Sequence, residues 1–247
     1  MCCFSRPVKL VADTNIFARG SKEGRQFLVY SMQLNANEDL AMILPIPVPK
    51  DSKENAVRFI NLEEYPTFFP ELRAGFPIPL SASRDAGAKS ATLSNKLEVV
   101  SVGSFEASFV PAIKDFARLD ERFRLPTSVW EKLPQYKDYG FAVFKLKKGA
   151  SKVHPMAFEF PRANPEQLFF PTVHIHDGKI HARAKFDHAL YCQRAGNDKL
   201  ELTDWQESTT LAGLFMKVKK AQGLLEPDEH CYLKELRGQH KNEDVVL

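Results

Sequence analysis

Residues 169–186 constrain the fold of this chain more than any other stretch, because a strong turn dipeptide separates two alternating flanks. Asp177-Gly178 is typical of a two-residue β-hairpin turn, in which both central residues need positive φ. Such a turn would place His174 opposite His181. Since side chains alternate along a strand, one face of the hairpin is apolar and the other gathers three of the seven histidines.

The histidine face predicts a transition-metal site. Histidines two residues apart on a strand point the same way, about 7 Å apart at a rise of ~3.3 Å per residue, and a cross-strand histidine lies within reach of both. Three neutral imidazoles with an open position suit a zinc, copper or iron ion. The predicted ligands are His174, His176, His181 and His188, and the predicted supporting residues are Asp187 and Cys192.

A solvated, non-catalytic face is the alternative interpretation of the same hairpin. Lys179, Arg183 and Lys185 share the polar face, and cations repel a metal ion. In that case the basic face could bind an anionic ligand without catalysis.

The N-terminus offers a second alternative, an amidohydrolase. Removal of Met1 would leave Cys2 with a thiol and a free amine that titrates near pH ~8, so that the residue carries its own base. The first twenty residues resemble N-terminal-nucleophile hydrolases of the bile-salt-hydrolase and penicillin-acylase type. That resemblance implies that Arg19 lies beside the Cys2 nucleophile.

Composition and charge argue against two classes of binding partner, nucleic acids and membranes. A net charge of +3, from 34 basic and 31 acidic residues, does not indicate nucleic-acid binding, and no apolar run is long enough to span a bilayer. Four cysteines do not make a disulfide framework in a chain of 247 residues, so we expect reduced thiols and a cytoplasmic location. A small-molecule substrate or ligand is therefore the expected partner.

Strands are expected in neighbouring groups, which favours an α+β class of mostly antiparallel sheet layers. Helices are expected to be inserted after the N-terminal strands and appended at the C-terminus. We expect one domain over 1–247, with a flexible loop at about 77–95 and a frayed tail at about 239–247. Strands are expected at 26–34, 139–147 and 156–160, among others, and the longer of the expected helices are 51–62, 66–76, 208–224 and a last one that begins at Pro227.

Four stretches of the chain resemble an uncharacterised family of bacterial domains of unknown function. The matching stretches are Cys2–Ser5, Leu44–Pro49, Tyr139–Leu146 and His154–Pro161. The resemblance implies a shared fold, and it implies no activity.

Overall fold

The computed structural model describes residues 2–21, 23–77, 100–102, 105–152, 154–175, 180–194 and 200–247. The strands are β1 (Cys2–Phe4), β2 (Leu10–Gly20), β3 (Arg25–Ala36), β4 (Leu40–Ile46), β5 (Arg58–Asn61), β6 (Val100–Val102), β7 (Phe105–Val110), β8 (Gly140–Leu146), β9 (Gly149–Lys152), β10 (Met156–Pro161), β11 (Phe169–Phe170), β12 (His174–Ile175), β13 (Arg183–Gln193), β14 (Gln206–Glu207), β15 (Tyr232–Lys241) and β16 (Val245–Val246). The helices are α1 (Phe68–Ala74), α2 (Thr127–Trp130) and the 3-10 turns η1 (Glu54–Ala56), η2 (Ile113–Arg118), η3 (Glu121–Phe123), η4 (Pro134–Tyr136), η5 (Ala212–Leu214) and η6 (Val218–Ala221).

The protein is mostly β, so the predicted α+β class with appended helices is wrong. In the described residues the strands form a six-stranded sheet of order β12-β1-β4-β8-β7-β6 and an eight-stranded sheet of order β14-β15-β13-β2-β3-β10-β5, in which β9 also pairs with β3. β11 and β16 form a separate pair. The pairing is mixed, because β1 with β12 and β2 with β13 run parallel.

The predicted C-terminal helices are absent from the described residues, and in the last segment a long strand takes the place of a helix. Residues 208–224 contain only the short turns η5 and η6, and the segment after Pro227 leads into β15. β15 pairs antiparallel with β13 along ten register positions from Cys192↔Tyr232 to Arg183↔Lys241. In the segment after Pro227, long-range pairing therefore overrides the expected helix, as tertiary context commonly does.

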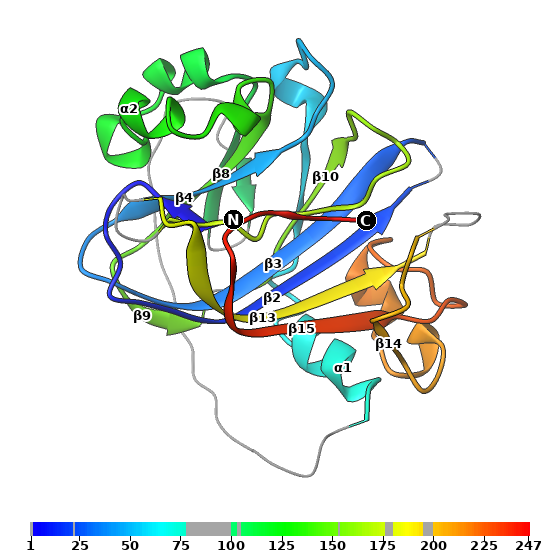
Figure 1. The fold of residues 1–247 in the computed structure, drawn as a ribbon. Helices are drawn as coiled ribbons and strands as arrows, with labels where there is room; N and C mark the ends of the chain where they lie inside the picture. Colours follow the sequence, from blue (N-terminus) through cyan, green and yellow to red (C-terminus); the bar gives the residue numbers. More distant parts are fainter. Residues whose placement is uncertain are drawn as a thin grey trace.

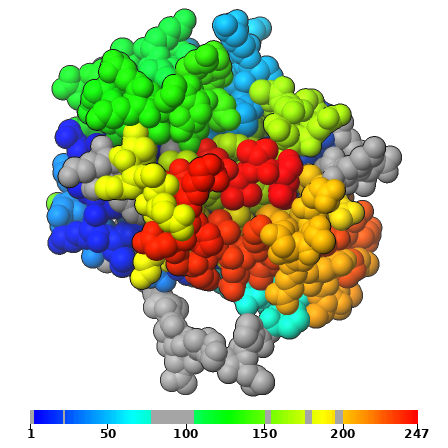
Figure 2. All heavy atoms as spheres, viewed as in Figure 1, coloured from blue at the N-terminus to red at the C-terminus, as the bar shows by residue number. Residues whose placement is uncertain are grey.

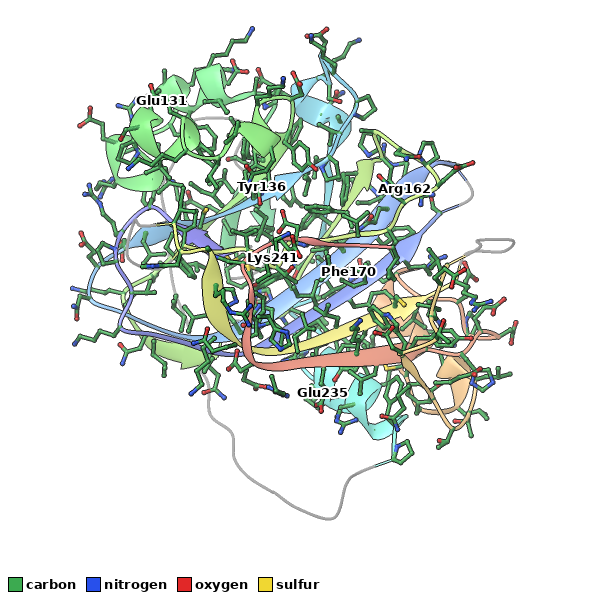
Figure 3. The ribbon with its side chains drawn as sticks, in the orientation of Figure 1. Glu131, Tyr136, Arg162, Phe170, Glu235 and Lys241 are labelled. Carbon is green, nitrogen blue, oxygen red and sulfur yellow. The ribbon has the colours of Figure 1, made fainter. Side chains whose placement is uncertain are left out.

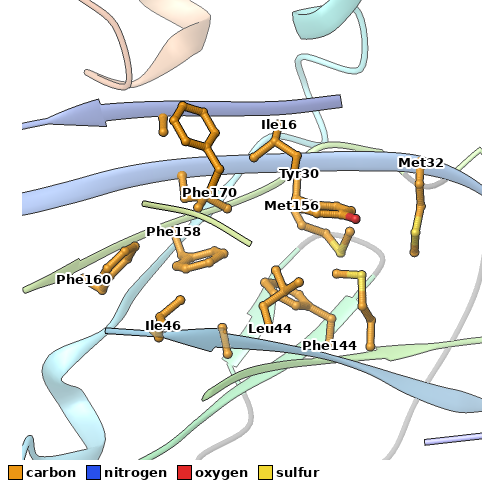
Figure 4. Close-up of a cluster of buried hydrophobic side chains, with 14 of the residues drawn as sticks. Ile16, Tyr30, Met32, Leu44, Ile46, Phe144, Met156, Phe158, Phe160 and Phe170 are labelled. Atoms are coloured by element: carbon orange, nitrogen blue, oxygen red, sulfur yellow. The ribbon is translucent and has the colours of Figure 1, made fainter. Parts of the chain in front are cut away.

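Three hydrophobic clusters separate four layers of structure. Alternate residues of the eight-stranded sheet enter different clusters: Ile16 and Leu190 face the six-stranded sheet, whereas Phe17 and Tyr191 face α1 and the turns η5 and η6. Figure 4 shows the cluster between the two sheets, where Phe144 meets Phe158. Because both faces of its middle strands are covered, the eight-stranded sheet lies inside the molecule.

Short helices cover the outer faces of both sheets. The third cluster packs η2, α2 and η4 on the six-stranded sheet, and these segments form the green cap of Figure 1. Its aromatic centre is Trp130, which stacks on Phe116 and contacts Phe141. On the other side, α1 lies beneath the eight-stranded sheet, next to the orange η5–η6 region.

The C-terminal residues are held in place, although the sequence predicted a frayed tail over 239–247. The Asp244 carboxylate accepts from the backbone N–H groups of Thr172 and Val173, at 2.8 and 3.0 Å, and from the Tyr136 hydroxyl. Leu247 exchanges two backbone hydrogen bonds with Leu168. The red segment of Figure 2 thus lies across the front face between the helical cap and the orange region, and Figure 3 labels Tyr136 beside it.

Candidate interaction surface

The predicted histidine hairpin is not formed by the described residues. β12 pairs with β1, so that His174 lies opposite Cys2, whereas β13 pairs with β15 and β2 in the other sheet. His176 and the turn residues 177–179 lie outside the described residues. The two flanks separate because Val173 and Ile175 are buried under the helical cap of the six-stranded sheet, while β13 belongs to the central sheet.

The structure brings two of the four predicted metal ligands together. The His174 and His188 ring centroids are 4.7 Å apart, and Phe186 contacts both rings. Asp187 approaches His188 with 3.6 Å between its Oδ1 and the ring Nδ1, but its Oδ2 accepts from the Asp13 backbone N–H. His181 is exposed and its carbonyl oxygen accepts from the Asn242 amide.

The metal-binding prediction is therefore wrong. No group of three or more histidine, cysteine or acidic residues that could hold a metal ion occurs in the described part of the chain. Cys192, a predicted supporting residue, lies in the cluster between the two sheets, where burial raises the pKa of its thiol. The pair of rings is better explained as an aromatic contact that joins β12 to β13.

Burial of His188 makes the stability of the fold pH-dependent. Its side chain is 1% exposed, and desolvation lowers the pKa of the ring below its ordinary value of 6.5 in spite of the nearby Asp187. The unfolded chain therefore binds this proton more readily, so the contribution of His188 to the free energy of unfolding should be constant above pH ~6.5 and fall as the pH drops below it. Urea titrations at a series of pH values should show a smaller decline in the free energy of unfolding for His188→Gln than for the wild type. An equal decline would show that His188 is not the source of the pH dependence. His154, whose pKa burial also lowers, should keep part of the decline in both proteins.

Arg19, the other residue of the amidohydrolase alternative, holds a loop in place. Its guanidinium donates to the carbonyl oxygens of Leu224 and Gly223 at 2.9 and 2.6 Å and pairs with Glu226 at 2.8 Å. It lies in the eight-stranded sheet, whereas Cys2 pairs by its backbone in the six-stranded sheet. Arg19 and Cys2 thus belong to strands of different sheets.

Three cysteines are expected to react only after unfolding. Cys3, Cys192 and Cys231 are buried, and burial raises the pKa of the Cys231 thiol to about 12. Because the thiolate is the reactive form, a Cys2→Ser variant should bind no thiol reagent in its native state and should react at all three thiols in denaturant. Rapid native labelling at any of the three would contradict this burial.

One Ser–His–Glu cluster does not have the geometry of a catalytic triad. Ser208 Oγ and Glu207 Oε1 both approach the same nitrogen, His230 Nδ1, at 3.3 and 3.7 Å. A triad uses opposite nitrogens of the ring for the nucleophile and the carboxylate. The Ser208 hydroxyl instead accepts from the Cys231 backbone N–H and donates to the Thr210 carbonyl.

The turn around η5 presents two exposed leucines that lie three residues apart in the sequence. Leu214 is 76% exposed and Leu211 is 37% exposed. The neighbouring Ala212 and Met216 are buried in the cluster beneath the eight-stranded sheet, which fixes the turn from inside. We call Leu211, Leu214 and the half-buried Phe215 the leucine surface.

Backbone contacts hold the leucine surface in one conformation. The amides of Ala212 and Gly213 donate to the carbonyl oxygens of Glu229 and Pro227 at 3.0 and 2.8 Å. Any side chain at residue 213 would place its Cβ 3.0 Å from the Pro227 oxygen, so this close approach favours glycine. On the other side the Phe215 ring packs against Gly75 at the end of α1.

Sequence reasoning missed this surface because the helical spacing of Leu211, Leu214 and Phe215 predicted a helix over 208–224. Gly213 was the available signal against that helix, since glycine in a helix interior costs about 1 kcal/mol relative to alanine. The structure uses the glycine for the contact with Pro227 instead.

The fold and this surface define a class: a mostly β protein of two packed sheets, with short outer helices and an exposed apolar turn. No protein-family model and no curated protein matches the sequence. Solved structures with a similar arrangement come from a baculovirus, and the protein in them is P35. Baculovirus P35 has 16% identity to this chain and a TM-score of 0.46, with 96% of each chain covered.

Two further similar structures contain P35 in other states. P35 in its complex with caspase-8 has 14% identity and a TM-score of 0.47, covering 96% of this chain and 95% of P35. A mutated P35 after caspase cleavage has 15% identity and a TM-score of 0.46, covering 98% and 99%. These similarities assign no activity to this chain. The predicted bacterial origin and cytoplasmic location gain no support from them, and no described helix is long and apolar enough to cross a membrane.

Proposed function

We propose that this protein acts by binding another protein through the leucine surface. The observation that carries the proposal is the exposure of Leu214 and Leu211 on a turn whose conformation is fixed by backbone hydrogen bonds. A contiguous exposed apolar patch with a polar rim is typical of protein interaction sites. The other large apolar residues that are exposed in the described residues (Leu10, Ile180 and Val246) belong to separate segments.

Burial of the leucine surface would supply binding energy at a low entropic cost. Transfer of a leucine side chain from water to an apolar site is worth about 1.5–3 kcal/mol. The turn is already ordered by its contacts with Pro227 and Glu229, so little loop ordering is needed on association. Rigid apolar residues of this kind commonly act as the central residues of an interface.

The experiment introduces a photoreactive phenylalanine analogue at position 214 and, as a matched control, at position 246. Val246 is also exposed, at 47%, and lies outside the leucine surface. The labelled protein is irradiated in cell extract and, separately, with purified caspase-8 as a defined probe, because one of the similar structures contains that protein. Adducts are identified by mass spectrometry.

We expect protein adducts from position 214 that are lost in Leu211→Asp, and few from position 246. Equal adduct formation at both positions, or none at either, would contradict the proposal. An adduct with caspase-8 would identify the partner, whereas its absence beside a different adduct would exclude caspase-8 and leave the surface as the binding site.

A further inference from the structure

The outer edge of β15 is open along most of the strand. β14 pairs with β15 only at Leu233 and Tyr232, and no other described strand pairs with that side of β15. Within the described chain, residues 234–241 therefore pair with β13 alone. An open edge presents backbone N–H and C=O groups to which another strand can add.

The hydrogen bonds of the ladder show which backbone groups of β15 point outward. The Asn242 amide donates to the Ala182 carbonyl oxygen at 3.0 Å, one position beyond the end of the β13–β15 register. Because hydrogen-bonded positions alternate in an antiparallel pair, even-numbered residues of β15 bond β13 and odd-numbered residues point outward. In agreement, the carbonyl oxygen of Cys231, at an odd position, accepts from the Ser208 amide on the β14 side at 2.8 Å.

Two side chains cap successive outward carbonyl groups of the open edge. Arg183 Nη2 donates to the Gln239 carbonyl oxygen at 2.9 Å. His240 Nε2 lies 2.9 Å from the Arg237 carbonyl oxygen, where the ring nitrogen acts as the donor. The His240 ring is itself packed against Phe186, with 5.6 Å between the ring centroids. Both capping groups thus lie where an added strand would have to place its own backbone donors.

The uncapped edge would be complementary to itself. An antiparallel pair of two β15 strands centred on Gly238 brings odd-numbered positions opposite odd-numbered positions, as the ladder requires. This register places Glu235 opposite Lys241 of the second copy, and by symmetry it does so twice. It also places Arg237 opposite Gln239 of the second copy, so no like charges are directly opposed.

We infer that Arg183 and His240 keep the edge of β15 from pairing with the same edge of a second copy of this chain. The edge is thus a latent dimer interface that two side chains hold closed. Covering an edge with charged side chains is a common protection against strand addition. The inference goes beyond the proposed function, because it concerns β15 and not the leucine surface.

Sedimentation velocity of the full chain tests the inference in Arg183→Ala/His240→Ala, with Lys185→Ala as the matched control. Lys185 is exposed on the same strand as Arg183, and its side chain bonds no carbonyl group of the described residues. We expect the double variant to dimerise with a dissociation constant at least tenfold below that of any self-association of the wild type. Lys185→Ala should behave as the wild type does.

Gln239→Pro, added to the double variant, locates the contact. The N–H group of Gln239 points away from β13, so proline removes an outward donor without breaking the ladder and should restore the monomer. Amide hydrogen exchange gives a second readout. The amides of Arg237 and Gln239 should exchange quickly in the wild type and at least tenfold more slowly in the double variant.

Three results would overturn the inference: a double variant that stays monomeric, a Lys185→Ala variant that dimerises equally, or a dimer that Gln239→Pro leaves intact. A wild type that already dimerises, with slow exchange at these two amides, would overturn it as well. If the proline variant does not fold, amide exchange in the double variant decides, and unchanged rates at Arg237 and Gln239 contradict the inference.

Discussion

Replacement of Asp244 by alanine should lower the free energy of unfolding by about 3 kcal/mol, since each donor left without a partner costs on the order of 1–3 kcal/mol. The carboxylate accepts from the amides of Thr172 and Val173 and from the Tyr136 hydroxyl. It thus joins the C-terminal segment to the residues just before β12 and to the helical cap. Urea unfolding followed by tryptophan fluorescence measures the loss.

Asp244→Asn is the matched control. Its amide oxygen can still accept from Thr172 and Val173, while the Tyr136 hydroxyl can turn to accept from the amide nitrogen. We therefore expect a loss well below that of the alanine variant. If both variants were as stable as the wild type, the C-terminal segment would not be held by this carboxylate.

Arg19→Ala should destabilise the fold by roughly 3 kcal/mol, because it removes a buried charge that is bound to a half-exposed carboxylate and two carbonyl oxygens. The variant also loses the contact of the guanidinium with the Phe27 ring, at 4.8 Å from its centroid. Arg19→Lys keeps the charge but not the planar, forked guanidinium, so the stability of this variant should lie between those of the wild type and Arg19→Ala.

Arg58→Ala provides the comparison. Arg58 is exposed and shares its partner Glu159 with Arg25, so its removal should change stability by less than about 0.5 kcal/mol. Equal effects of the Arg19 and Arg58 substitutions would mean that the loop at residues 223–226 does not depend on Arg19.

Local sequence patterns were enough to predict several elements. The strands expected at 26–34, 139–147 and 156–160 are confirmed as β3, β8 and β10, and the helix expected within 66–76 is confirmed as α1. In β3 the residues Leu28 and Tyr30 share the core face that the period of two requires. These segments carry their own signal because one face of each is continuously apolar.

Pairing between distant segments could not be predicted in the same way. The parallel register of β13 with β2 joins residues 188–193 to residues 14–19, and nothing local in either segment specifies it. The same is true of β1 with β12, which separates the two flanks of the predicted hairpin. A hairpin turn signal at 177–178 was therefore compatible with a chain that passes from one sheet to the other.

The candidate site was missed for a related reason. Leucines at helical spacing are usually buried, whereas Leu214 is exposed on a turn whose backbone is bonded to Pro227 and Glu229. Conversely, histidines at strand spacing predicted a metal site that required a hairpin pairing which the described residues do not form.

The central claim is that Leu214 serves binding rather than folding, and one variant tests it most directly. For Leu214→Asp we measure the free energy of unfolding in urea at low protein concentration and the crosslinking of a photoreactive group placed at position 211. Stability within about 0.5 kcal/mol of the wild type together with loss of adducts is the predicted result, since surface substitutions rarely affect folding. A large loss of stability, or unchanged adducts, would contradict the claim.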